Sequence, residues 1–179
     1  MSDDQPKRCL LKAAEIEGMA AACIRHPFNP GSEVHLRPLS ELAGMGRVRL
    51  SLGRIPPGKE SFAYHAHEAD EEFVYILSGR GRAEIGEETV EVGPGDFMGF
   101  AAPSVAHHLV NPYDEDLVYL MGGERSRVEV GTFPRAGKRI IFSASGIWQV
   151  DEKDLRQMGL EQWLADDPKD ASEGDEITG

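Results

Sequence analysis

Two histidines and a glutamate form the group of residues best suited to chemistry: His65, His67 and, five positions later, Glu72. On a β-strand, side chains two residues apart point to the same face, so both imidazoles could contact one metal ion. Glu72 opens the apolar segment FVYIL, where an unpaired carboxylate would be costly and needs a cation or a proton. Glu71 competes for this role but points to the opposite face of a regular strand. We therefore prefer Glu72 as the third ligand.

A fourth ligand is expected from the adjacent pair His107 and His108. Neighbouring residues on a strand point to opposite faces, so only one of the two can reach the metal, and the pattern alone barely separates them. A histidine taken singly is more often a hydrogen-bonded core residue than a ligand. Four histidines and a glutamate from two hairpins favour a metal site. His26 and His35 have no such spacing, and we expect them to be structural.

The segment from 47 to 132 is expected to position these residues as one antiparallel β-barrel or sandwich. Short alternating segments repeat there between turn signals such as PPG at 56–58 and GPGD at 93–96, which is typical of antiparallel sheets rather than βαβ units. FVYIL at 73–77 is apolar on both faces, which predicts a central strand covered on each side. Further strands are expected at 107–110, 117–121 and 139–142.

Two extensions flank this barrel. Residues 1–46 are expected to form an N-terminal arm that packs on the barrel, with a short helix near 13–22. Residues 133–179 form a C-terminal extension, in which DEKDLRQMGLEQWL from Asp151 predicts a short helix weakened by Gly159. Trp148 and Trp163 are expected to be packing anchors. The acidic end from Asp166 predicts a solvated, flexible tail.

Composition limits the classes of function. The chain has 179 residues, which suits one domain, and a net charge of −12, which argues against nucleic-acid and anionic-membrane partners. It contains no apolar run long enough to span a bilayer and no signal-peptide core near its first residues, so we expect a cytoplasmic protein. Two cysteines, Cys9 and Cys23, provide no disulfide framework and are expected to be reduced thiols.

The region from 46 to 132 resembles the cupin superfamily through two motifs. GKESFAYHAHEADEEFVYILSG is similar to the first motif, and GDFMGFAAPSVAHHLVN is similar to the second. The His-x-x-x-Asn spacing of the second motif assigns the fourth ligand to His107. The sequence departs from the pattern in two loops: six residues separate Gly58 from His65, and Val105 stands where a glycine is common. The resemblance implies an all-β double-stranded β-helix, a jelly roll, with the arm and the short C-terminal helix added.

Three imidazoles and one carboxylate would leave coordination positions open on a single divalent ion, which could be manganese, iron, nickel or zinc. We expect a protein that acts on a small molecule, either a sugar-like isomerase or epimerase or an oxygenase such as a dioxygenase. The alternatives are a non-catalytic metabolite-binding module and a purely structural metal.

An isomerase also needs a base, for which Tyr75, Tyr64 and His108 are candidates. Several cations near the barrel could bind an anionic group, although exposed strand cations usually serve solubility; they are Arg49, Arg54, Lys59, Arg82, Arg135, Lys138 and Arg139. The apolar outer face of FVYIL predicts a homodimer, an assembly that is common among similar cupins.

Overall fold

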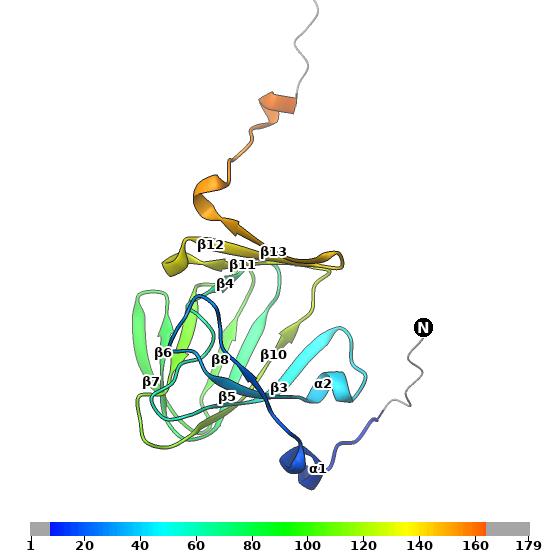
Figure 1. Ribbon diagram of the computed structural model, residues 1–179, viewed down its shortest axis with the longest axis vertical. Coiled ribbons are helices and arrows are strands. Elements are labelled where there is room, and N and C mark those ends of the chain that lie inside the picture. Colours follow the sequence, from blue (N-terminus) through cyan, green and yellow to red (C-terminus); the bar gives the residue numbers. More distant parts are fainter. Residues whose placement is uncertain (1–7, 164–179) are drawn as a thin grey trace, which may run out of the picture.

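The computed structural model describes residues 8–163, and most of them lie in antiparallel strands (Figure 1). The strands are β1 (Ala22–Ile24), β2 (Val34–Pro38), β3 (Val48–Ile55), β4 (Ala66–His67), β5 (Glu72–Ser78), β6 (Gly81–Ile85), β7 (Glu88–Val92), β8 (Phe97–Phe100), β9 (His107–Val110), β10 (Leu117–Glu124), β11 (Val128–Phe133), β12 (Lys138–Ser143) and β13 (Gly146–Asp151). The α-helices are α1 (Ala13–Gly18) and α2 (Leu39–Leu42), and the 3-10 helices are η1 (Pro134–Ala136), η2 (Glu152–Asp154) and η3 (Leu160–Trp163).

The strands form three sheets. The largest has the strand order β1-β2-β3-β10-β5-β8, a smaller one has the order β7-β6-β9, and the third has the order β13-β12-β11-β4. The third sheet lies across one end of the barrel in Figure 1. The expected all-β antiparallel fold is confirmed, as are the strands expected at 107–110, 117–121 and 139–142.

The side chains that point inward from the strands form one core. They are Val34, Ile55, Val74, Ile76, Ala83, Val92, Met98, Phe100, Leu109, Leu117 and Tyr119. Gly79 ends β5 with φ +77°, and a Cβ at this position would lie 2.1 Å from the carbonyl oxygen of Asp116. Only glycine fits this turn, which returns the chain into β6 and so helps to set the barrel register.

Strand β5 is central in its sheet, with β10 on one side and β8 on the other. Its inner face is buried, but its outer face is open in the single chain: Tyr75 is 39% and Leu77 41% exposed, and the neighbouring Phe97 of β8 is 64% exposed. The barrel itself therefore covers only one face of FVYIL. A second covering layer stays a prediction.

The N-terminal arm extends the large sheet. Helix α1 falls within the range expected to be helical, and β1 and β2 add two strands next to β3. Asn29, in the loop between β1 and β2, donates to the carbonyl oxygen of Phe62 at 2.8 Å and to Glu60 at 2.9 Å. These bonds attach the arm to the barrel beside the chain that leads into His65.

The expectation of a C-terminal helix from Asp151 is wrong within the described residues. Residues 151–163 form the end of β13, the two 3-10 turns η2 and η3, and an irregular segment that contains Gly159. Leu155, Met158 and Trp163 stay exposed, so no apolar surface stabilises a helix here. Trp163 at 72% and Trp148 at 55% exposure are not the packing anchors that we expected. The acidic tail lies outside the described residues.

No helix among residues 8–163 is long and apolar enough to cross a membrane.

Candidate metal centre

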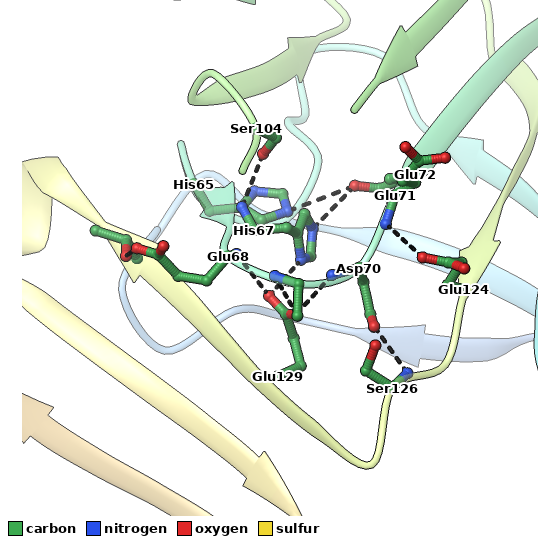
Figure 2. A network of polar contacts seen from close by, with 12 residues as sticks. His65, His67, Glu68, Asp70, Glu71, Glu72, Ser104, Glu124, Ser126 and Glu129 are labelled. Atoms are coloured by element: carbon green, nitrogen blue, oxygen red, sulfur yellow. Dashed lines mark hydrogen bonds and ion pairs between the residues drawn. The ribbon is translucent and has the colours of Figure 1, made fainter. Parts of the chain in front are cut away.

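Four donors meet at one end of the barrel, and we call them the barrel cluster: His65, His67, Glu72 and His107. His65 and His107 are directly opposite each other in an antiparallel bridge and exchange both backbone hydrogen bonds, at 3.1 and 2.8 Å. Side chains of such a pair point to the same face. His67 follows in β4, and Glu72 is the first residue of β5. Figure 2 shows the rings of His65 and His67 facing the Glu72 carboxylate.

One carboxylate oxygen is the centre of this cluster. Oε2 of Glu72 lies 3.0 Å from Nε2 of His67, 3.0 Å from Nε2 of His107 and 3.9 Å from Nε2 of His65. The four donor atoms all lie within 4.8 Å of one another. Two donors that each lie about 2.1 Å from a common ion, at right angles, are about 3.0 Å apart. The donor set therefore fits one divalent metal ion.

Hydrogen bonds on the far side of the rings prepare them as ligands. Nδ1 of His65 lies 2.7 Å from the carbonyl oxygen of Ala63, and Nδ1 of His107 lies 3.0 Å from the carbonyl oxygen of Val105. A carbonyl oxygen only accepts, so each neutral ring carries its proton on Nδ1. In this neutral form, each ring can present the lone pair of Nε2, the ring atom that faces the cluster, to a metal ion.

Glu129 of β11 performs the same task for His67, and the sequence analysis missed it. Its carboxylate is 3% exposed and lies 3.2 Å from Nδ1 of His67. It also accepts backbone N–H groups from Glu68, Ala69 and Asp70 at 3.0, 2.9 and 2.7 Å (Figure 2). Glu129 thus fixes both the ring and the loop that joins β4 to β5. Its place in alternation with the inward Phe133 was the available signal.

Burial and charge act in opposite directions on the protonation of the cluster. Burial lowers the pKa of His65 to about 4, so this ring is neutral near pH 7. Burial also lowers the pKa of His67, but the contacts with Glu72 and Glu129 outweigh it and the net pKa is raised. Burial raises the pKa of Glu72, yet the hydrogen bonds with His107 and His67 hold it far below its usual range. Glu72 is therefore ionised and can balance a cation.

Aromatic rings surround the histidines. Phe100 stacks on His107 with ring centroids 3.7 Å apart, and Phe133 stacks on His65 at 5.8 Å. His26 of the arm packs on Phe133 at 4.9 Å, which agrees with the structural role expected for it. The arm therefore takes part in the packing that supports the cluster.

Two cavities are each lined by at least two of the four donors. The inner cavity, of about 30 Å³, lies within the barrel between His65, His107 and the apolar core. The outer cavity, of about 220 Å³, opens past His67 and Glu72. Space for a water molecule requires about 10–15 Å³ on this measure, so the inner cavity takes one or two small molecules. Of these two cavities, only the outer one has room for a sugar-sized ligand.

The three residues expected as bases do not gather at the outer cavity. The Tyr64 hydroxyl donates to the carbonyl oxygen of Gly86 at 2.8 Å, and Tyr75 stands on the exposed outer face of β5. His108 lines the inner cavity instead, and its Nδ1 lies 3.2 Å from Glu84.

Tyr119, which the sequence analysis did not single out, lies on the inner cavity instead. It is buried, and burial together with the charge of Glu72 raises its pKa. Its alternation with Leu117 and Met121 was the available signal.

The fold and the cluster define a small antiparallel β-barrel protein with a candidate site for one metal ion. The family model described as a cupin domain matches residues 51–123. A candidate sugar phosphate isomerase from Acidithiobacillus ferrooxidans is 35% identical, with a TM-score of 0.81 over 84% of this chain and 97% of that one. The chain belongs to the cupin superfamily, as its two motifs indicated.

Two more distant structures share the fold. A sugar phosphate isomerase of the cupin superfamily from Silicibacter pomeroyi is 22% identical, with a TM-score of 0.72 over 83% of this chain and 96% of that one. A predicted oxalate decarboxylase from Thermotoga maritima is 22% identical, with a TM-score of 0.54 over 62% of this chain and 96% of that one. The curated proteins contain no match to this chain.

Proposed function

We propose that the chain is an enzyme that isomerises a sugar-like hydroxy-carbonyl compound, with the barrel cluster as the ligands of one divalent metal ion. The observation that carries this proposal is the position of the four donor atoms, which converge beside a cavity large enough for a small sugar. The name of the protein that is 35% identical supports the same reaction class.

The donor set suits manganese, iron, nickel or zinc in the divalent state. When bound, such an ion supplies a Lewis acid that polarises a substrate carbonyl group. The protein's own contribution is to hold the donors in place before binding: the Ala63 and Val105 carbonyls orient two rings, and Glu129 orients the third. Such pre-orientation raises both affinity and precision.

The wall of the outer cavity supplies groups that can move a proton. Isomerisation transfers a proton between adjacent carbons, which requires a base within hydrogen-bond reach of the substrate. Glu71 and Glu124 both line this cavity, and the backbone N–H of Glu71 lies 3.5 Å from the Glu124 carboxylate. We infer that one of these two carboxylates accepts the proton and returns it.

The same wall favours an uncharged substrate over its phosphate ester. The residues that line it include the acidic Glu41, Asp70, Glu71 and Glu124 in addition to the ligand Glu72. Among the described residues that line the cavity, Arg49 is the only arginine or lysine. Carboxylates repel a phosphate dianion in the mouth of the site but not a neutral sugar.

Dioxygen chemistry is a second candidate, and the inner cavity favours it. Its wall is largely apolar and includes Val74, Met98 and Leu109 beside the donors His65 and His107. A diatomic gas fits a space of this size, whereas a sugar does not. Oxygen consumption by the iron-loaded protein would support this alternative.

We also propose a homodimer that covers the outer face of β5 and β8. Phe73 and Phe97 stack on this face with centroids 6.1 Å apart, beside the exposed Tyr75 and Leu77. Contiguous exposed apolar side chains are typical of association surfaces. Light scattering should give twice the chain mass for the wild type and the monomer mass for Leu77→Glu. A monomeric wild type would contradict the dimer.

Exchange of substrate hydrogen with solvent tests the main proposal. The protein, loaded in turn with each of the four metals, is incubated in D₂O with a panel of aldoses and ketoses, and NMR follows deuterium at the carbon next to the carbonyl. We expect incorporation that is lost in His67→Ala, falls strongly in Glu71→Gln or Glu124→Gln, and persists in the exposed control Glu88→Gln. Tight sugar binding without exchange would favour the non-catalytic module.

A further inference from the structure

A second group of metal-binding side chains lies on the arm, far along the sequence from the barrel cluster. Cys23 of β1 is the register partner of His35 in β2. Glu33, two residues before His35, points to the same face of this ribbon. We call these three residues the edge cluster, because β1 forms the edge of the six-stranded sheet. The spacing of these residues in the sequence does not predict the group, because Cys23 and His35 are brought together only by the pairing of β1 with β2.

The donor atoms of the edge cluster converge. One atom each from Cys23, Glu33 and His35 lies within 4.8 Å of the others. Oε1 of Glu33 lies 3.1 Å from Nε2 of His35, while Oε2 of Glu33 accepts from Arg25 at 2.8 Å. The two oxygens of Glu33 thus serve different partners. An ion could take Oε1 without breaking the ion pair with Arg25.

We propose that the edge cluster is a second metal site, selective for zinc, in which Cys23, Glu33 and His35 are the protein ligands. A thiolate, an imidazole and a carboxylate form a donor set that zinc accepts and that magnesium and calcium do not favour. The barrel cluster contains no sulfur, so the two sites differ in chemistry. Three protein ligands leave the fourth tetrahedral position for water.

The charges around the edge cluster set its properties. Hydrogen bonds from Arg25 and His35 lower the pKa of Glu33 to about 2, and the charge of Lys59 acts in the same direction. Arg25 also interacts electrostatically with Cys23. The same cations oppose a bound metal, so we expect weaker binding here than in the barrel cluster.

Zinc at this position would fasten the arm to the sheet. Strand β1 is held to β2 by only three register pairs, and all three of its residues are exposed. Leu36, next to His35, points to the other side of the ribbon and lines the outer cavity. Metal binding on the outer face would therefore steady one wall of the proposed substrate cavity.

Cobalt(II) provides a direct test, because a cobalt–thiolate bond produces an intense near-ultraviolet charge-transfer band that nitrogen and oxygen ligands do not. The full-length protein is titrated with cobalt and then with zinc, under a non-thiol reductant, with circular dichroism to verify folding. In the wild type we expect a band that develops only after the first equivalent has filled the barrel cluster and that disappears when zinc displaces cobalt. The band should persist in His67→Ala, which lacks a ligand of the barrel cluster.

Single substitutions then assign the ligands. Cys23→Ser should abolish the band, and His35→Gln should weaken cobalt binding at least 10-fold, whereas Cys9→Ser, which alters the other exposed cysteine, should change neither. Cys23 is exposed, so its replacement by serine should leave the fold intact. No band at millimolar cobalt, or a band that Cys9→Ser removes and Cys23→Ser does not, would overturn the proposal. If the wild type bound no metal at the barrel cluster and showed no exchange activity, but still gave this band, the result would contradict only the proposed enzyme function.

Discussion

The barrel cluster and the edge cluster differ in how their donor atoms are held. In the barrel cluster, the side chains are 8–18% exposed, and each ring is fixed by a hydrogen bond on its far side. In the edge cluster, Cys23 is exposed and Glu33 is shared with Arg25. Burial makes an uncompensated carboxylate such as Glu72 costly, so the barrel cluster depends on a cation or on protonated histidines. In the edge cluster, Arg25 already balances the charge of Glu33, so this carboxylate has no such need.

This difference predicts that metal binding is stronger at the barrel cluster than at the edge cluster, and that substitution of a ligand lowers metal affinity by a larger factor there. The largest effect is expected for His67→Ala. Removal of one arm of the His-x-His pair should lower metal affinity at this cluster by on the order of 1,000-fold or more, by analogy with the loss of a chelating ligand. Metal titration measures the change.

The neighbouring histidines supply the control for that experiment. His107→Ala should behave like His67→Ala, whereas His108→Ala should keep the metal, because the ring of His108 contacts Glu84 on the other face of β9. Loss of metal in His108→Ala with retention in His107→Ala would reverse this assignment.

Glu129→Gln should have an intermediate effect. The amide can still contact Nδ1 of His67 but carries no charge, and loss of such a supporting carboxylate typically costs about 10–100-fold in metal affinity. It should also lower the pKa of His67, because Glu129 helps to raise it. Metal titration with NMR of the His67 ring measures both. An unchanged pKa together with unchanged affinity would show that Glu129 only supports the loop at 68–70.

The dependence of metal affinity on pH should also separate the clusters. A metal must displace any proton from His67, whose pKa is raised, so affinity at the barrel cluster should begin to fall while the pH is still above the usual histidine range. In Glu129→Gln this fall should begin at a lower pH. Titrations at several pH values check the order. A fall in metal affinity that begins at a higher pH in the variant than in the wild type would contradict the role of Glu129.

The smallest effect concerns thermal stability. Metal at 100 times its dissociation constant stabilises the folded state by about 2.7 kcal/mol. For a chain of this size we expect a rise in Tm of roughly 5–10 °C on loading the barrel cluster. At equal total zinc, the edge cluster should add less because it binds more weakly. Calorimetry of Cys23→Ser and His67→Ala separates the two contributions.

Much of the barrel cluster could be predicted from sequence because its signals are local. His65 and His67 are two residues apart, and strand alternation separates Glu72 from Glu71. The second motif assigned His107, which the structure places beside Glu72. The first three assignments need only the period of a β-strand, whereas the assignment of His107 rests on the resemblance to the second cupin motif.

The parts that sequence did not reveal depend on pairing between distant segments. Glu129 reaches His67 because β11 pairs with β4, and Cys23 meets His35 because β1 pairs with β2. The helix expected from Asp151 does not form, for a related reason. A short amphipathic helix needs a surface to pack on, and Trp163 has none within the described residues. Register and docking are properties of the whole fold rather than of local spacing.

Metal content of the purified protein tests the central claim most directly. Elemental analysis of the wild type should find near-stoichiometric manganese, iron, nickel or zinc, and the variant that lacks His65, His67 and His107 should lose it while Cys23→Ser retains it. The same metal content in the wild type and the triple variant, or no metal in the wild type after reconstitution with each of the four ions, would contradict a metal centre at the barrel cluster.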